Sequence, residues 1–433
     1  MPGCTRRPCR TCEPRVTGGP VARNSVARVG VATAVSALCG YAVLYLAARS
    51  LEPAGFSLFG VFWGAFGLVT GAAFGLLQEA TREVRAARHT AAVTGPRTHP
   101  MQVAAGLGVA AAVFIAVTAP LWSAHVFAQS RLLSVLLLSI GLAGFCMHAT
   151  LLGMLAGVDR WTQYGALMVT DAGLRVVIAA ASFLAGWGLA GYLWATVAGS
   201  VAWLLLLLAS PASRAAAVLA TPGSVRTFLA GASHSIAAAG ASAILIMGFP
   251  VLLKATTAHL GATGGVVILA VTLTRAPLLV PLTALQGNLI AYFVDKPHER
   301  LRALVTPALV VGAIGLVGIV AAGLAGPWLL RAAFGPDYVA GGGLLAWLTA
   351  GAVAIALLTL TGAATVAAAL HRAYATGWVS ATVAATLLLL LPLELETRTI
   401  VALLCGPVAG IAVHLAALAR GSRRGSERLR PPH

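Results

Sequence analysis

Two oppositely charged side chains lie one helical turn apart inside an apolar stretch of this sequence. Asp171 and Arg175 fall in segment 163–185, and a rise of about 1.5 Å per residue puts both roughly 12–18 Å into a helix. Their i,i+4 spacing places them on one helix face, where the carboxylate and the guanidinium group can pair. Arg275 occurs at a similar depth in segment 265–291, which has no acidic residue near it.

These charges indicate a site for an anionic ligand. A charge at the centre of a bilayer costs roughly 2.5–3.5 kcal/mol, so it needs a partner or a purpose. We expect Arg175 and Arg275 to line a water-filled cavity and attract an anionic headgroup, while Asp171 tunes Arg175 or carries a coupling proton or cation. The alternative is a buried structural pair, together with an arginine that bonds to carbonyl groups.

Histidines and cysteines give weaker signals. His148 and His234 fall in apolar segments and could titrate near neutral pH, although hydrogen-bonded packing is the favoured interpretation. Cys9 and Cys12 form a single C-x-x-C with only Cys4 nearby. A zinc site needs more ligands, so we expect no metal site and no cofactor.

The elements that must position these residues are transmembrane helices. Of the 433 residues, 59% are hydrophobic and 9% charged, whereas soluble domains carry about 25% charged residues. Continuous apolar runs long enough to cross about 30 Å of hydrocarbon favour helices over a barrel. The sequence predicts an all-α integral membrane protein with about twelve spans: 27–48, 54–78, 101–122, 133–156, 163–185, 190–210, 228–253, 265–291, 303–325, 341–369, 374–392 and 399–419.

Loop charges predict the orientation and the domains. The formal net charge is +17. With twelve spans, most arginines fall on one side of the membrane, which predicts that both termini are cytoplasmic. We expect the membrane to be the cell (inner or plasma) membrane. We expect a disordered cytoplasmic tail (1–26), a six-helix bundle (27–210), a cytoplasmic linker (211–227), a second six-helix bundle (228–419) and a basic tail (420–433). The tails then contact anionic lipids rather than nucleic acid.

Glycines and prolines predict contacts and bends. Gly60, Gly64, Gly67, Gly71 and Gly75 repeat every three or four residues along span 54–78, a face that lets a neighbouring backbone approach closely. Pro250, Pro277, Pro281 and Pro407 should kink their helices. We find no P-loop, H-E-x-x-H or G-x-S-x-G motif, so the sequence favours a protein that is not an enzyme.

Three stretches resemble the polysaccharide transporters, of the O-antigen flippase type, in the multidrug/oligosaccharidyl-lipid/polysaccharide exporter superfamily. They are residues 47–80, which contain "ARSLEPAGFSLFG", residues 153–195, which begin with "GMLAGVDRWTQYG", and residues 326–379, which begin with "GPWLLRAAFGPDYVAGG". Residues 267–293 are also similar to that family's eighth helix. The resemblance implies two six-helix bundles around a central cavity with alternating access.

The same resemblance implies that a lipid-linked oligosaccharide (a polyprenyl diphosphate) moves from the inner to the outer leaflet for cell-surface polysaccharide biosynthesis. Partners would be that lipid, membrane lipids, a coupling H⁺ or Na⁺, and polysaccharide biosynthesis machinery. A cationic cavity suits a diphosphate because arginine pairs with phosphate bidentately. The alternatives are a drug/cation antiporter on the same fold, a polytopic membrane enzyme of polysaccharide assembly, and a non-transporting membrane scaffold.

Overall fold

The computed structural model describes residues 20–89, 95–296 and 299–428 and confirms an all-α membrane fold. Ten helices among these residues are long and apolar enough to cross a membrane. The first of them contains two predicted spans, and a further helix, α15 (His371–Leu389), covers the eleventh. The structure therefore accommodates the twelve predicted spans. Cys4, Cys9, Cys12 and residues 1–19 of the predicted tail lie outside the described residues.

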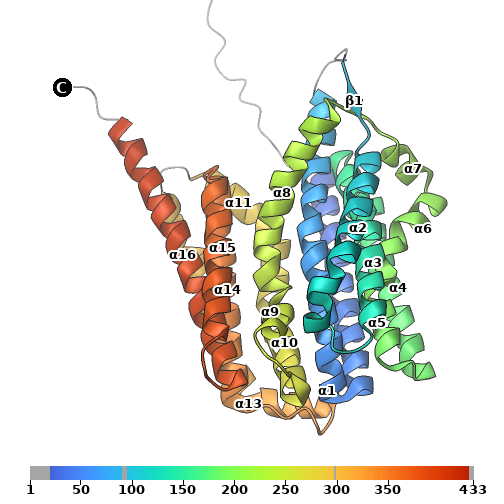
Figure 1. Ribbon diagram of the computed structural model, residues 1–433. Coiled ribbons are helices and arrows are strands. Elements are labelled where there is room, and N and C mark those ends of the chain that lie inside the picture. Colours follow the sequence, from blue (N-terminus) through green and yellow to red (C-terminus); the bar gives the residue numbers. More distant parts are fainter. Residues whose placement is uncertain (1–19, 90–94, 297–298, 429–433) are drawn as a thin grey trace, which may run out of the picture.

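The N-terminal half forms one side of the molecule in Figure 1, coloured blue to green. Its elements are α1 (Pro20–His89), β1 (Arg97–Thr98), α2 (Pro100–Val126), α3 (Arg131–Gly157), α4 (Trp161–Ala185), α5 (Gly188–Ala198), the 3₁₀ helix η1 (Gly199–Val201), α6 (Ala202–Ala209), α7 (Pro211–Ala217) and β2 (Thr221–Pro222). Residues 20–26, predicted as part of a disordered tail, are helical because α1 begins at Pro20. The predicted linker 211–227 likewise contains α7 and β2.

The C-terminal half contains both short and long helices. They are α8 (Val225–Ile246), α9 (Phe249–Ala255), α10 (Gly261–Ala284), α11 (Gln286–Val294), α12 (Arg300–Ala303), α13 (Val305–Phe334), α14 (Gly342–Ala367), α15 and α16 (Leu395–Arg428). The helix α16 extends through most of the predicted basic tail. Pro250 lies at the break between α8 and α9, whereas Pro277 and Pro281 lie inside α10.

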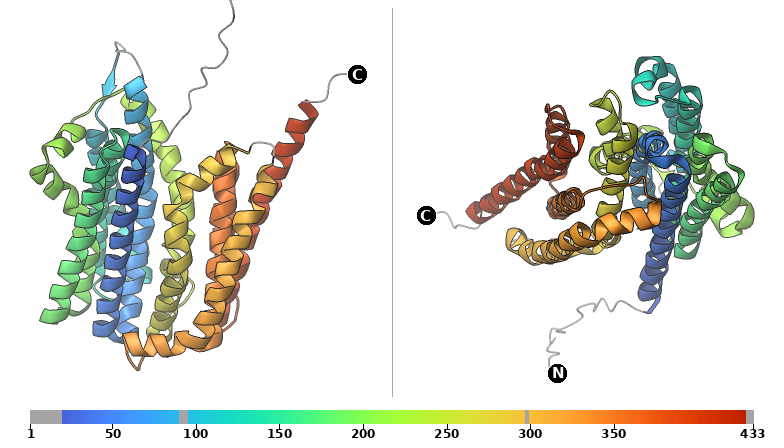
Figure 2. Two further views of the ribbon diagram at one scale, coloured as in Figure 1. Left: turned by 180° about the vertical axis from the view of Figure 1, so that it is seen from behind. Right: turned by 90° about the horizontal axis from the view of Figure 1, so that it is seen from below.

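The helix α1 folds back on itself at Glu52. This residue has φ 54° and ψ 170°, and Pro53 follows it; a side chain in that left-handed region is strained. Both ends of α1 then reach the same end of the molecule, because Arg28 donates to Thr162 Oγ1 at 3.0 Å and Arg85 pairs with Asp159. We call this the arginine end, and the opposite end, at Glu52, the turn end. Figure 2 shows the two arms of α1 side by side.

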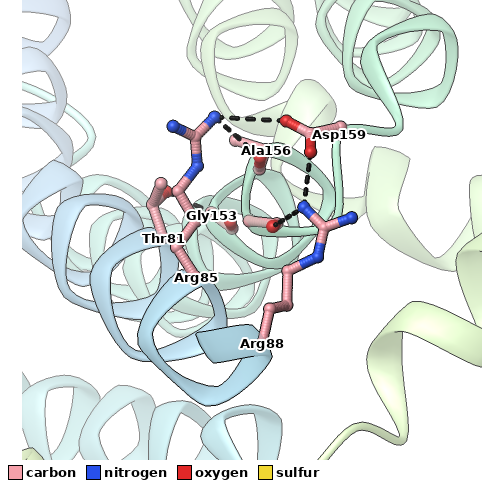
Figure 3. Close-up of polar contacts among 7 residues, drawn as sticks. Thr81, Arg85, Arg88, Gly153, Ala156 and Asp159 are labelled. Atoms are coloured by element: carbon pink, nitrogen blue, oxygen red, sulfur yellow. Dashed lines mark hydrogen bonds and ion pairs between the residues drawn. The ribbon is translucent and has the colours of Figure 1, made fainter. Parts of the chain in front are cut away.

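An ion-pair cluster fastens α1 to the loop after α3 at the arginine end (Figure 3). Arg85 Nη2 lies 3.3 Å from Asp159 Oδ1, Arg88 pairs with Asp159 Oδ2, and Arg88 Nη1 donates to Gly157 O at 3.1 Å. Cations beside the carbonyl groups that end a helix interact favourably with its dipole. The cluster therefore fixes the second arm of α1 to α3 within the N-terminal half.

The five regularly spaced glycines of α1 form what we call the glycine seam: Gly60, Gly64, Gly67, Gly71 and Gly75. A Cβ atom at Gly71 would lie 2.6 Å from the Cβ of Ala243, and one at Gly75 would overlap the backbone of Ile236. Toward the turn end, a Cβ at Gly60 would lie 2.7 Å from Ile268 Cγ2. The predicted close approach is confirmed, and the partners are α8, α9 and α10. The largest apolar core accordingly includes side chains from both halves.

A short antiparallel ladder joins the two longest predicted loops at the arginine end. Thr98 pairs with Thr221, and Arg97 pairs with Pro222. Thr98 Oγ1 also donates to Gly223 O at 2.8 Å, and Gly223 N donates to Pro96 O at 2.9 Å. The chain that enters the C-terminal half is therefore bound to the N-terminal half immediately before α8 begins.

Candidate functional site

The predicted pair of Asp171 and Arg175 forms on one face of α4. Arg175 Nη2 and Nε lie 2.9 Å and 3.2 Å from Asp171 Oδ1, and the two side chains are 16% and 18% exposed. The guanidinium group also lies over the ring of Phe66 in α1, 5.5 Å from its centroid. The pair therefore faces the interior of the N-terminal half, where the cation–π contact adds to the ion pair.

Gly199 provides the space for this pair. It begins η1, which interrupts span 190–210 between α5 and α6. A Cβ atom at Gly199 would overlap the carboxylate of Asp171 and would lie 2.7 Å from Arg175 Nε. The absence of a side chain at this residue thus allows the ion pair to lie against the backbone of the opposite helix.

His148 lies near the pair but has a different environment. It is buried on α3, its ring is stacked on Phe145 with centroids 5.2 Å apart, and its Nδ1 has no hydrogen-bond partner among the residues that the structure describes. Phe145 in turn contacts Phe66, the ring beneath Arg175. His148 therefore belongs to the same interior as Asp171 and Arg175.

Arg275 on α10 lies at the break between α8 and α9. Its Nη1 donates to Ile246 O at 3.0 Å and to Leu245 O at 3.3 Å, and its guanidinium carbon is 5.0 Å from the centroid of Phe249. The residue is 6% exposed. In this conformation Arg275 thus bonds to carbonyl groups, which is the arrangement that the second of the two interpretations of the sequence describes.

Part of the Arg275 guanidinium group is nevertheless unpaired. Its Nε and Nη2 atoms are buried and have no hydrogen-bond partner, and Arg275 forms no ion pair within the described part of the chain. A buried donor without an acceptor costs about 1–3 kcal/mol, more when it is charged. Two donor atoms are therefore available to an anion or to water that reaches this position.

The two arginines lie on opposite sides of the contact between α1 and α8. Phe66, beneath Arg175, precedes Gly67 of the glycine seam, and a Cβ at Gly67 would lie 3.2 Å from the Cβ of Met247. Met247 follows Ile246, whose carbonyl group binds Arg275. The contact between α1 and α8 thus separates the guanidinium group of Arg175 from that of Arg275.

His234 does not join either arginine. It is exposed on α8, and its Nδ1 lies 2.6 Å from Ala230 O in the same helix. The residue therefore pairs within its own helix.

A cavity of about 310 Å³ lies at the turn end. It is bounded by the start of the second arm of α1, the end of α2 and the loop after α9, and its polar lining side chains are Ser57, Gln129, Lys254 and His259. Lys254 Nζ donates to Ala258 O at 2.7 Å. None of the five predicted site residues lines this cavity.

A third buried polar cluster, centred on His414, was not predicted from the sequence. This histidine is fully buried on α16 and contacts Thr361 of α14 and Tyr374 of α15. It falls within the predicted span 399–419. The signal that could have found it is therefore the one that identified His148, a histidine inside an apolar segment.

Sequence comparison finds close relatives in mycobacteria. The Uncharacterized protein Rv3630 of Mycobacterium tuberculosis (strain ATCC 25618 / H37Rv) is 70% identical over 405 residues, which are 93% of this chain and 94% of that protein. The Uncharacterized protein Mb3654 of Mycobacterium bovis has the same identity and coverage. The chain belongs to this mycobacterial family. No family model matches the chain.

Solved structures show which fold this mycobacterial family adopts. An inward-facing multidrug resistance MATE family transporter of the MOP superfamily matches with a TM-score of 0.70 and 14% identity, over 90% of this chain and 96% of that one. An outward-facing structure of a multidrug resistance MATE family transporter matches with a TM-score of 0.61. The mycobacterial family therefore has the MOP superfamily fold, and this chain is a multi-pass membrane protein.

Proposed function

We propose that this protein moves a lipid-linked oligosaccharide, carried on a polyprenyl diphosphate, from the inner to the outer leaflet by alternating access. The observation that carries the proposal is which of the charged side chains in the middle of the spans have an oppositely charged partner. Asp171 is neutralised by Arg175, whereas Arg275 has two unpartnered donors and no counter-ion among the described residues. The surplus charge in the span interiors is thus positive, which suits a diphosphate and disfavours a cationic drug.

The headgroup would bind in contact with both arginines when the contact between α1 and α8 opens. A diphosphate cannot cross bare hydrocarbon, because burial of unpaired charge is prohibitive. The guanidinium group of Arg275 would exchange its bonds to carbonyl groups for phosphate oxygens, and Arg175 would share its charge between Asp171 and the ligand. Asp171 then tunes Arg175 or takes up a coupling ion. A MOP superfamily transporter from Pyrococcus furiosus, which matches with a TM-score of 0.61, is described as having a binding pocket of reverse polarity that suggests a different function.

The proposed architecture has two halves, 27–210 and 228–419, with the arginine end in the cytoplasm. The positive-inside rule supports this orientation. Partners in a polysaccharide biosynthesis machinery would supply the lipid-linked glycan on the cytoplasmic side.

The test is leaflet exchange of a fluorescent polyprenyl-diphosphate glycan in proteoliposomes that contain the purified protein. We expect exchange with the wild type and at least a tenfold lower rate, per folded molecule, with Arg175→Ala or Arg275→Ala. Arg131→Ala, which alters an exposed arginine at the start of α3, is the matched control. Wild-type exchange rates in both variants would refute the arginine site. Export of a cationic dye without glycan exchange would favour the antiporter, and cleavage or joining of the glycan would favour an enzyme.

A further inference from the structure

The cluster around His414 connects three helices of the C-terminal half. The Nδ1 atom of His414 lies 3.0 Å from Thr361 Oγ1, and its Nε2 atom lies 3.2 Å from Tyr374 O. The imidazole is also parallel to the Tyr374 ring, with an angle of 6° and centroids 6.2 Å apart. Both ring nitrogens of a fully buried histidine are therefore bonded to neighbouring helices.

The packing of α15 on α16 leaves a space of the size of one imidazole. A Cβ atom at Gly377 would overlap the His414 ring, and one at Gly410 would lie 2.5 Å from Gly377 O. Two glycines thus let the helices approach and leave room for the ring. His414 is held in one position by backbone geometry as well as by hydrogen bonds.

The hydrogen-bond partners accept this histidine in either protonation state. A carbonyl oxygen can only accept, so Tyr374 O requires a hydrogen on Nε2. In the neutral ring Nδ1 is an acceptor, and the Thr361 hydroxyl donates to it. In the protonated ring Nδ1 donates to Thr361 Oγ1, and the hydroxyl hydrogen turns to Leu358 O, which lies 3.0 Å away. Every polar atom of the cluster has a partner in both states.

We propose that His414 is a reversible proton-binding site of the C-terminal half. A proton from water binds at Nδ1 while the Thr361 O–H rotates from Nδ1 to the carbonyl group of Leu358; release reverses these steps. The site is separate from Asp171, which lies on α4 in the other half. That the bound proton is coupled to transport rests on the proposed function, whereas the binding of the proton does not.

The surroundings of the site keep such a proton exchangeable. The titratable or charged groups on the packed elements include Tyr374, His371 and Arg372 on α15, Arg420 on α16, Arg275 on α10, and Arg300 and Arg302 on α12, and α14 contributes none among the described residues. The carboxylates of α16 itself, Glu396 and Glu427, are 18 and 13 residues from His414 along the helix, too far to hold the imidazolium ion. Arg420 follows His414 by six residues, about 9 Å along the helix, so the ring lies close to the arginine end and to water.

The site is tested by nitrogen NMR of purified protein labelled with ¹⁵N-histidine in nanodiscs. The chain has ten histidines, and His414→Gln identifies the signals that belong to His414. Burial disfavours the charged ring, so we expect Nδ1 of His414 to gain a proton only as the pH falls from about 6.5 toward about 4.5, with Nε2 protonated throughout and the fold unchanged. A ring that stays neutral from pH 8.5 to pH 4.5 would overturn the proposal.

Variants of Thr361 test the proposal without altering the histidine. Thr361→Val removes the acceptor of the charged form, so proton affinity should fall about tenfold, one unit in the titration midpoint, while Thr361→Ser should titrate like the wild type. Thr359→Val is the matched control, because Thr359 has the same exposure, 7%, and its hydroxyl bonds to Ile355 O of its own helix α14. Equal midpoints in Thr361→Val and Thr359→Val would overturn the role of the hydroxyl.

Leaflet exchange separates this proposal from the proposed function. If His414 titrates but no glycan is exchanged, the proton site stands and the transport proposal fails. If glycan is exchanged and His414 never titrates, the flippase proposal stands and the proton site fails. A proton-coupled cycle predicts that Thr361→Val shifts the pH dependence of exchange in the direction of its NMR titration.

Discussion

Arg275 Nη1 donates to the carbonyl oxygen of Ile246, the last residue of α8, across 3.0 Å. The end of a helix leaves carbonyl groups without partners, and here a cation from another helix satisfies them. The break between α8 and α9 is therefore stabilised by a group that also has two unpartnered donors. This double role makes Arg275 a residue on which both the fold and the proposed ligand depend.

Arg275→Ala should reduce stability as well as transport. The change removes the donor to Leu245 and Ile246, and buried carbonyl groups without partners cost about 1–3 kcal/mol. We expect a lower thermal midpoint in detergent, measured by fluorescence-detected size-exclusion chromatography, and an intermediate midpoint for Arg275→Lys. Arg131→Ala should melt like the wild type. A wild-type midpoint for Arg275→Ala would show that these bonds contribute nothing.

The glycine seam should not tolerate side chains. Gly75→Val places carbon atoms against the backbone of Ile236, which cannot move as a flexible side chain does, and overpacking of this kind costs about 1–3 kcal/mol. Gly40→Ala is the control on the other arm of α1, since no atom of the described residues lies within 4 Å of its Cβ position. The folded yield and the melting temperature of the two variants should differ. Equal values would contradict the contact between α1 and α8.

The pair of Asp171 and Arg175 should show coupling in a double-mutant cycle. Arg175→Gln leaves a carboxylate largely buried without its partner, which we expect to cost roughly 1–3 kcal/mol, less than for a fully buried pair because both side chains keep some exposure. Asp171→Asn combined with Arg175→Gln should recover part of that loss. Additive losses in the free energy of unfolding would indicate that the two side chains do not interact.

Tyr338, at the turn end, should make the stability of the folded protein depend on pH. Its hydroxyl donates to Ala48 O at 3.0 Å, which ties the loop after α13 to the first arm of α1. Burial, followed by the charges of Asp337 and Glu52, raises the pKa of Tyr338. The folded protein thus favours the neutral phenol, so this stabilisation is complete below about pH 10 and is lost as the pH rises above it.

Tyr338→Phe should therefore lower stability by about 0.5–1.5 kcal/mol at neutral pH and reduce the further loss between pH 10 and pH 12. Thermal midpoints across that pH range measure both effects. Tyr45→Phe, which changes a 43% exposed tyrosine, is the control. An alkaline loss in Tyr338→Phe as large as in the wild type would assign that loss to another group.

Local patterns in the sequence were sufficient to predict the spans and the ion pair. Apolar length located the turn of α1 between the segments 27–48 and 54–78, and i,i+4 spacing was enough to pair Asp171 with Arg175, because both features depend only on residues close in the chain. The same holds for the glycine repeat, whose face was predictable although its partners α8 to α10 were not.

Partners distant in the chain could not be predicted. Arg275 binds carbonyl groups 29 and 30 residues earlier, and those groups are free only because α8 stops at Ile246. The environment of His414 depends on Gly377 in α15, on Gly410 in α16 and on a hydroxyl in α14, which hydrophobic periodicity does not reveal. Which of the two buried histidines among the described residues, His148 or His414, has both ring nitrogens bonded is a property of helix packing, and a single sequence without packing information gives no means to rank them.

The pairing of β1 with β2 sets a length limit on movement. Only Gly223 and Ser224 separate β2 from the first residue of α8, and the three Cα–Cα steps from Pro222 to Val225 span at most about 11 Å. While β1 and β2 remain paired, the start of α8 must move together with the N-terminal half. The contact between α1 and α8 would then part away from the ladder, at Gly67 and Met247 rather than at Gly75 and Ile236.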